Sequence, residues 1–104
     1  MRPDNVICVA NAYKQAYYFN EDEFGLLPQQ IRDELQILCV TFAEEVGGVF
    51  SLYFDDEGEL QIMTEADDDD ILYDEIGAGL KVRQIQRDNV ELFRSLELFR
   101  RTFF

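Results

Sequence analysis

The chain of 104 residues contains no histidine. Histidine is the commonest general acid and base and the commonest metal ligand, so its absence excludes Ser-His-Asp triads, Cys-His dyads and histidine-based zinc or iron centres. No phosphate-binding loop is present either, because Gly47-Gly48 and Gly77-Ala78-Gly79 lack the GxGxxG and GxxxxGK spacings. We therefore expect no catalytic residue and no cofactor, and the sequence favours a protein that is not an enzyme.

Cysteine is scarce as well, and the two that occur, Cys8 and Cys39, lie in apolar runs. No second cysteine stands at metal-ligand spacing from either, and neither has a basic neighbour that would stabilise a thiolate nucleophile. The sequence therefore favours two buried free thiols over a disulfide, which fits a reducing compartment. The apolar run from Val6 to Ala10 is too short for a signal-peptide core or a membrane span, so we expect a cytoplasmic protein.

Basic side chains are few, 9 against 22 acidic ones, and the formal net charge is −13. This charge repels phosphate backbones and anionic lipids, so we expect no direct binding of nucleic acid or membrane. The charge is uneven, because residues 1–79 hold 19 acidic and 3 basic side chains, whereas residues 80–104 hold 3 acidic and 6 basic ones. The acidic part predicts a basic protein partner, whose approach it would accelerate at low salt.

The chain does contain enough apolar residues for a core, 47% of the total, without repeats or linkers, so we expect one domain over residues 1–104. Periodicity and turn residues predict strands and helices in this order: strands at 6–10 and 13–19, a loop at 20–27, a helix at 28–46, and a hairpin of strands at 50–54 and 60–64 that turns at Gly58. A final helix follows. This order predicts an α+β fold with a four-stranded antiparallel sheet and two helices on one face. The strand order stays open, and a parallel α/β sheet is the minor alternative.

The final helix is predicted to be long, starting at the carboxylates of residues 67–70 and running to the C-terminus. Carboxylates suit a helix N-terminus, and two arginines near the other end suit a C-terminus. Leu72, Ile76 and Leu80 are out of phase with the apolar residues that follow. We therefore expect a kink or a close packing contact near Gly77.

Apolar residues of this helix alternate at spacings of three and four over three heptads, and Asn89 falls at an a position of the pattern. The seam consists of Val82, Ile85, Asn89, Leu92, Leu96, Phe99 and Phe103. A buried asparagine at an a position sets register and pairing in coiled coils. We therefore expect a homodimer through this helix, in which Asn89→Leu raises stability but loosens the association state. Packing of the helix on its own domain alone is an equal alternative. The expected interface residues are Ile85, Asn89, Leu92, Leu96, Phe99 and Phe103.

Acidic side chains gather between residues 65 and 75, and carboxylate oxygens are the ligands that calcium and magnesium prefer. The candidate ligands are Glu65, Asp67, Asp69, Asp70 and Asp74, with Asp68 and Glu75 beside them. Their spacing does not match the loop of an EF-hand. A divalent-cation-binding protein or enzyme is therefore the alternative function, and a helix-capping run is the purely structural explanation.

A series of short motifs runs along the chain: Glu45-Val46-Gly47-Gly48, Phe54-Asp55 with Gly58, Glu65-Ala66-Asp67, Asp74-Glu75-Ile76-Gly77, and Leu92-Phe93 with Ser95-Leu96-Glu97. In this order and spacing the chain resembles a small bacterial family of acidic proteins that is defined as a domain of unknown function. The resemblance spans nearly the whole chain and implies a bacterial cytoplasmic protein, but it implies no activity, ligand or catalytic residue. The sequence as a whole favours a non-catalytic acidic protein-interaction module or adaptor that is homodimeric. A structural or regulatory subunit of a co-encoded partner is a third hypothesis.

Overall fold

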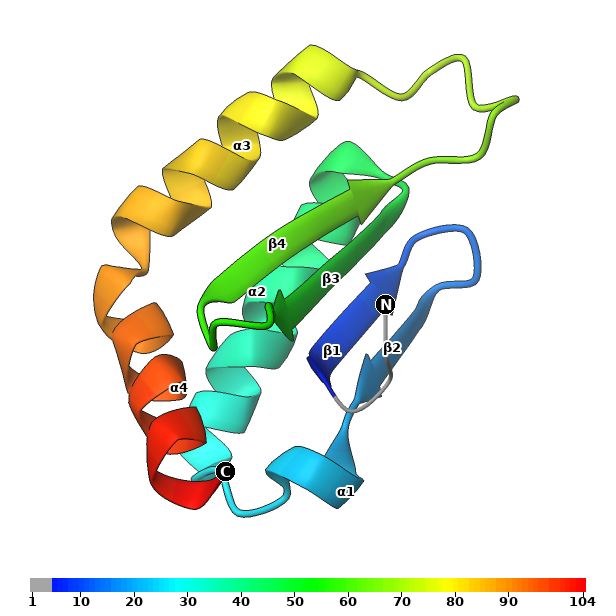
Figure 1. Cartoon of the computed structure of the whole chain (residues 1–104). Coiled ribbons are helices and arrows are strands. Elements are labelled where there is room, and N and C mark those ends of the chain that lie inside the picture. The colour runs from blue at the N-terminus through cyan, green and yellow to red at the C-terminus, as the bar shows by residue number, and fades with distance from the viewer. Residues whose placement is uncertain (1–4) are drawn as a thin grey trace.

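The computed structural model describes residues 5–104, and the first four residues, which the single-domain prediction included, lie outside the described residues. Figure 1 shows a sheet flanked by helices. The elements in chain order are β1 (Val6–Asn11), β2 (Ala16–Phe19), α1 (Glu21–Phe24), α2 (Gln29–Val46), β3 (Val49–Phe54), β4 (Leu60–Glu65), α3 (Glu75–Asp88) and α4 (Val90–Phe103). The prediction of an α+β fold with a four-stranded antiparallel sheet is confirmed.

The strands of the sheet follow the order β2-β1-β3-β4, which the sequence left open. β1 is an inner strand, because Val9 lies opposite Tyr18 of β2 on one side and opposite Ser51 of β3 on the other. β3 and β4 form the predicted hairpin, in which Ser51 lies opposite Met63. Gly58 in the turn has a φ of +81°, a left-handed conformation that glycine adopts without strain.

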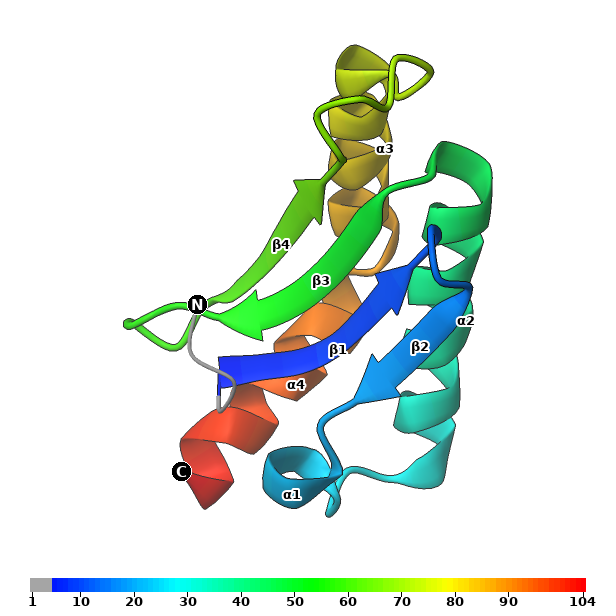
Figure 2. The same ribbon diagram turned by 90° about the vertical axis from the view of Figure 1, so that its right-hand side faces the viewer.

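The helices cover one face of the sheet, and in the described residues no helix covers the other face (Figures 1 and 2). α2 packs across β1 and β3, and the rings of Phe42 and Phe50 lie 4.5 Å apart between centroids. α4 packs near β4 on the same face. There the ring centroid of Phe99 lies 6.4 Å from that of Phe24 of α1. No helix within residues 5–104 is long and apolar enough to cross a membrane.

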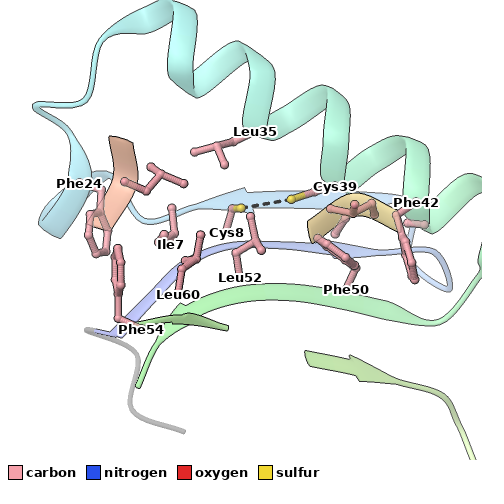
Figure 3. Close-up of a cluster of buried hydrophobic side chains, with 14 of the residues drawn as sticks. Ile7, Cys8, Phe24, Leu35, Cys39, Phe42, Phe50, Leu52, Phe54 and Leu60 are labelled. Atoms are coloured by element: carbon pink, nitrogen blue, oxygen red, sulfur yellow. Dashed lines mark hydrogen bonds between the residues drawn. The ribbon is translucent and has the colours of Figure 1, made fainter. Parts of the chain in front are cut away.

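One cluster of buried side chains joins the sheet to the helices (Figure 3). Leu35, Cys39 and Phe42 recur along α2 at spacings of four and three, and all are almost fully buried, as the predicted apolar face requires. Full burial of a leucine or phenylalanine side chain is worth about 1.5–3 kcal/mol. Cys8 of β1 lies in the same cluster, and it and Cys39 are buried free thiols, as predicted.

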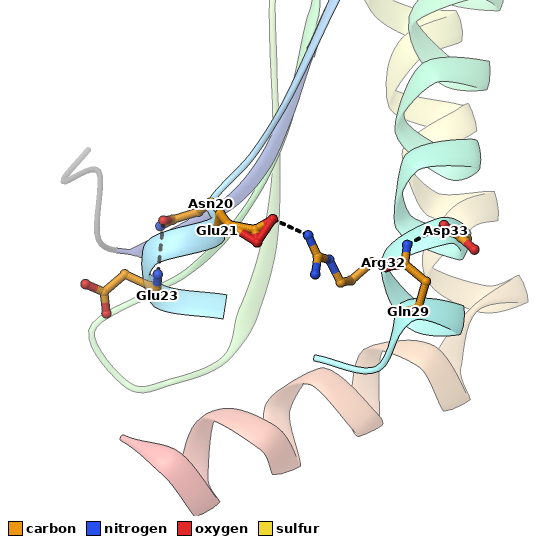
Figure 4. A network of polar contacts seen from close by, with 6 residues as sticks. All are labelled: Asn20, Glu21, Glu23, Gln29, Arg32 and Asp33. Atoms are coloured by element: carbon orange, nitrogen blue, oxygen red, sulfur yellow. Dashed lines mark hydrogen bonds and ion pairs between the residues drawn. The ribbon is translucent and has the colours of Figure 1, made fainter. Parts of the chain in front are cut away.

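The segment predicted to be a loop contains the one-turn helix α1, which a polar network holds in place (Figure 4). Asn20 caps this helix, because its Oδ1 accepts a hydrogen bond from the backbone N–H of Glu23 at 3.3 Å. Its Nδ2 also donates to the carbonyl oxygen of Val6 at 2.9 Å. Glu21 forms an ion pair with Arg32 of α2. A single turn is too short to show helical periodicity, so the sequence pattern did not reveal it.

The C-terminal segment is helical, but the prediction of one long helix is wrong, and of the two alternatives near Gly77 the structure shows the close contact and not the kink. Two helices, α3 and α4, meet at Asn89, whose φ of −122° and ψ of 31° interrupt the helical backbone. Residues 67–70 lie in the irregular connection before α3, and the helix is capped instead by Asp74, which accepts a hydrogen bond from the backbone N–H of Gly77 at 3.0 Å. A Cβ atom on residue 77 would clash with the Asp74 carboxylate, so the glycine makes room for the cap.

Candidate functional site

The residues predicted to form a dimer interface lie mostly in or against the core of their own chain. Ile85 and Leu96 are buried in that core, and Leu92 and Phe99 are half-buried against it. Phe103 is exposed near the end of α4. The structure therefore shows the packing of the helix on its own domain, which was the equal alternative. It contains one chain, so a homodimer through this segment stays a prediction.

Asn89, the residue predicted to pair across a dimer, makes its hydrogen bonds within the chain. Its backbone N–H and its side-chain Nδ2 both donate to the carbonyl oxygen of Ile85 at 3.0 Å. Its own carbonyl oxygen accepts the first hydrogen bond of α4, from the backbone N–H of Phe93 at 3.0 Å. Asparagine competes with helical hydrogen bonding through such local contacts, which explains the break at this position.

Acidic residues of the predicted metal site hold the connection between β4 and α3 in place. Asp70 accepts a hydrogen bond from the hydroxyl of Tyr13 at 2.6 Å, and that hydroxyl oxygen accepts one from the backbone N–H of Asp67 at 3.0 Å. The hydrogen bond to Asp70 raises the pKa of Tyr13. Because Asp74 caps α3, at least two carboxylates of this segment serve as acceptors for the chain itself.

An acidic hollow of about 430 Å³ lies between the end of β4 and the start of α3. It is lined by Thr64, Ala66, Asp67, Asp68, Asp70, Tyr73 and Glu75. Within residues 5–104, however, no three His, Cys, Asp or Glu side chains are arranged so that they could hold a metal ion. The candidate ligands Glu65, Asp67, Asp69, Asp70 and Asp74 therefore do not converge on a common point. Cation binding stays a prediction, which a thermal-shift titration with calcium, magnesium and manganese would test.

A second, wider groove of about 780 Å³ lies between the β1–β2 connection and α2. Small and amide side chains dominate its lining, and Glu44 is the one charged residue among them. Tyr17 also lines the groove, but its hydroxyl is buried and faces the Cys8 thiol, and burial is the main cause of its raised pKa. Catalysis by acid and base needs paired groups, and this lining does not provide a pair.

Four large aliphatic side chains are exposed at the start of α3, and we call these four residues the α3 tip. Ile71 is 92% exposed, Leu72 91%, Ile76 80% and Leu80 59%. Ile76 and Leu80 are one helical turn apart and therefore share a face of α3, while Ile71 and Leu72 lie in the connection three to four residues before the helix. Figure 1 shows that this end of α3 reaches beyond the end of the sheet.

The α3 tip is exposed although α3 itself is packed on the domain. The opposite side of α3 packs on the core through Ala78 and Ile85, which are buried. The Nζ atom of Lys81 also lies 2.8 Å from a carboxylate oxygen of Glu45 on α2. α3 is therefore held in an orientation that turns the side chains of the tip into solvent.

Carboxylates are close to the α3 tip in the sequence. Residues 65–75 contain seven acidic side chains and no basic one. Asp68, Asp69, Asp74 and Glu75 of this segment are exposed. An exposed apolar patch with a polar rim is typical of a site that binds another molecule.

Sequence reasoning identified the acidic segment but did not identify the apolar tip as a surface. The signal was present, because Leu72, Ile76 and Leu80 were out of phase with the apolar residues that follow them. Side chains that are out of phase with the core-facing row cannot reach the same core. The phase difference predicts a kink or a close packing contact near Gly77, whereas in the structure it also marks a second, exposed face.

The comparison with protein families agrees with the motifs quoted above, since one family model matches residues 4–104. The chain belongs to DUF6145, a family of unknown function. The expected resemblance is thereby confirmed. No curated protein and no solved structure matches the chain significantly. Membership of DUF6145 assigns neither activity nor partner.

Proposed function

We propose that this DUF6145 protein is a non-catalytic acidic protein-interaction module, and that its α3 tip binds a basic segment of a partner protein. The observation that carries this proposal is that residues 65–80 contain the four exposed aliphatic side chains of the tip together with seven carboxylates and no basic side chain. The complementary partner is an amphipathic helix, which presents apolar residues to the tip and lysine or arginine to the surrounding acids.

The apolar side chains give this contact its favourable free energy. Complete burial of one isoleucine or leucine is worth about 1.5–3 kcal/mol, so the four together contribute roughly 6–12 kcal/mol. Loss of translational and rotational freedom opposes association by about 4–15 kcal/mol. The apolar contact alone therefore supports weak binding, and the charges decide which partner binds.

The charges favour a basic protein over a second copy of this chain. Each copy carries a formal charge of −13, so two copies repel each other overall. A basic segment is attracted by the same field and associates faster at low ionic strength. Charges are screened over about 8 Å at physiological salt, so binding should weaken as salt is added.

A labelled model peptide tests the proposal directly. The probe is an amphipathic helix of leucine and lysine, about 18 residues or five turns long, titrated with the protein and followed by fluorescence anisotropy. We expect saturable binding that is at least about tenfold weaker for the double variant Ile76→Ser/Leu80→Ser, since tenfold corresponds to about 1.4 kcal/mol. The matched control Leu26→Ser removes an aliphatic side chain that is 76% exposed outside the tip, and it should bind like the wild type.

A second pair of variants tests the charges. Asp68→Asn/Asp69→Asn should weaken peptide binding and reduce its dependence on salt. Glu57→Gln/Glu59→Gln makes the same change in net charge at the β3–β4 turn and should have a smaller effect. Equal binding of a leucine–glutamate peptide, or unchanged binding by the double α3-tip variant, would contradict the proposal. A wild-type dimer in light scattering that becomes a monomer in that variant would identify a second copy as the occupant and overturn it.

A further inference from the structure

Cys8 of β1 and Cys39 of α2 bring their sulfur atoms together in the middle of the core (Figure 3). The two Sγ atoms lie 3.2 Å apart, and both side chains are fully buried. They are the only two cysteines of the chain. The sulfur–sulfur bond of a disulfide is about 2.05 Å long, so the two atoms need to approach by roughly 1 Å to form one.

We propose that this pair is a redox-modification site, at which a small peroxide such as hydrogen peroxide drives formation of an intramolecular disulfide. The bond would tie α2 to β1 and so cross-link the helical layer to the sheet. This proposal is independent of the proposed function, because it concerns chemical modification of two core residues and not binding at the α3 tip.

The reaction consumes one peroxide molecule for each disulfide. One cysteine, as its thiolate, attacks a peroxide oxygen, the O–O bond breaks, and the sulfur becomes a sulfenic acid while the first water leaves. The thiol of the other cysteine then attacks this sulfur, so that the S–S bond forms, the S–O bond breaks and the second water leaves. The two thiols lose two electrons to the peroxide, and their two protons leave in the water molecules.

The geometry favours a disulfide over further oxidation of a single sulfur. When the core closes over a sulfenic acid on either residue, the fold returns the second thiol to contact with it, so the second step needs no search for a partner. Leu35 and Leu52 are fully buried in the same cluster. Protein interiors are close-packed, so a sulfinic acid with two added oxygen atoms would have to displace such neighbours.

Burial controls the rate of this reaction. The hydrogen bond with Cys8, followed by burial, raises the pKa of Cys39 well above its ordinary value, so the closed structure keeps this residue as the unreactive thiol. Peroxide therefore reacts when α2 and β1 separate locally. Oxidation of the folded protein should be slow, and urea below the unfolding transition should accelerate it.

Intact mass after exposure of the folded protein to hydrogen peroxide tests the proposal. We expect the main product to be lighter by two hydrogen atoms and to have no reactive thiol after unfolding. Its thermal midpoint should rise by an amount on the order of 10 °C, because the closed loop restricts the unfolded chain, and dithiothreitol should reverse the rise. Cys8→Ala and Cys39→Ala each keep one thiol, so neither should show the mass loss or the higher midpoint.

Several outcomes of the same experiment would overturn the proposal. Two reactive thiols that survive in the peroxide-treated protein would show that no disulfide forms. A mass increase from added oxygen without loss of two hydrogen atoms, or a covalent dimer, would show that peroxide causes a different reaction. A disulfide-bonded chain with a lower midpoint than the reduced one would show that the bond strains the fold and does not lock α2 onto β1.

Discussion

Asn20 is a buried polar residue that ties two parts of the chain together, and its removal should be measurably destabilising. It is 4% exposed, it caps α1 through Glu23, and it donates to the carbonyl oxygen of Val6 at the start of β1. Asn20→Ala removes both hydrogen bonds at once. The residue therefore links the position of α1 to the inner strand of the sheet.

The expected loss of stability is the sum of the contributions of these two hydrogen bonds. Replacement of an N-cap asparagine by alanine lowers the free energy of unfolding by about 1 kcal/mol. A neutral hydrogen bond to a backbone carbonyl contributes about 1 kcal/mol more. Asn20→Ala should thus lower the free energy of unfolding by about 2 kcal/mol and the thermal midpoint by roughly 10 °C for a chain of this size.

Urea unfolding followed by far-ultraviolet circular dichroism measures this loss. The matched variant Asn20→Ser keeps an oxygen that can cap α1 but loses the amide donor, so it should lose about half as much, about 1 kcal/mol. A loss below about 0.5 kcal/mol for Asn20→Ala would refute the reasoning, because surface substitutions without a structural role stay within that range. Equal losses for the two variants would show that the cap contributes nothing.

Two further predictions concern a helix junction and a turn. Asn89→Leu should lower the free energy of unfolding by about 0.5–1 kcal/mol in urea, because it removes the side-chain hydrogen bond to Ile85; a rise in stability with a changed mass in light scattering would instead support the dimer seam. Asp55 accepts hydrogen bonds from the backbone N–H groups of Glu59 and Glu57, and the bond from Glu59 is the main reason why its pKa is lowered. A carboxyl group whose pKa is lowered by folding stabilises the fold at pH values above its pKa in the unfolded chain, about 3.9. This stabilisation is lost as the pH falls through the lower pKa of the folded state. Wild type should therefore exceed Asp55→Asn in stability at neutral pH, with the gap closing below roughly pH 4; a gap that is independent of pH would contradict this.

The elements that the sequence predicted well are those whose pattern repeats locally. α2 carries an apolar row over five turns and begins directly after Pro28, so periodicity and a helix-start residue agree. The β3–β4 hairpin alternates on both strands, and Gly58 has the conformation that its turn requires. Local signals of this kind need no knowledge of the rest of the chain.

The features that the sequence did not predict depend on contacts between distant residues or on a single side chain. The strand order places β1 between β2 and β3, which packing decides and which no local pattern encodes. α1 depends on the bond from Asn20 to Val6, 14 residues away. The break at Asn89 depends on one amide, whereas the heptad pattern continues through it.

The candidate site could be predicted only in part for the same reason. Its charge is visible in the sequence, because residues 65–75 contain seven acids. Its apolar part cannot be recognised in the sequence, because Ile76 and Leu80 would face the core if α3 were rotated differently about its axis. Lys81 and Ala78, which fix the rotation of α3 on the domain, settle which face is exposed.

Binding of the leucine–lysine peptide to the wild type and to Ile76→Ser/Leu80→Ser tests most directly whether the α3 tip binds a basic amphipathic segment. We expect saturable, salt-sensitive binding to the wild type and to Leu26→Ser, and binding at least about tenfold weaker for the double variant. Circular dichroism should show that all three proteins are equally folded. Equal affinity of the three proteins for the peptide would contradict the claim that the α3 tip is the docking surface.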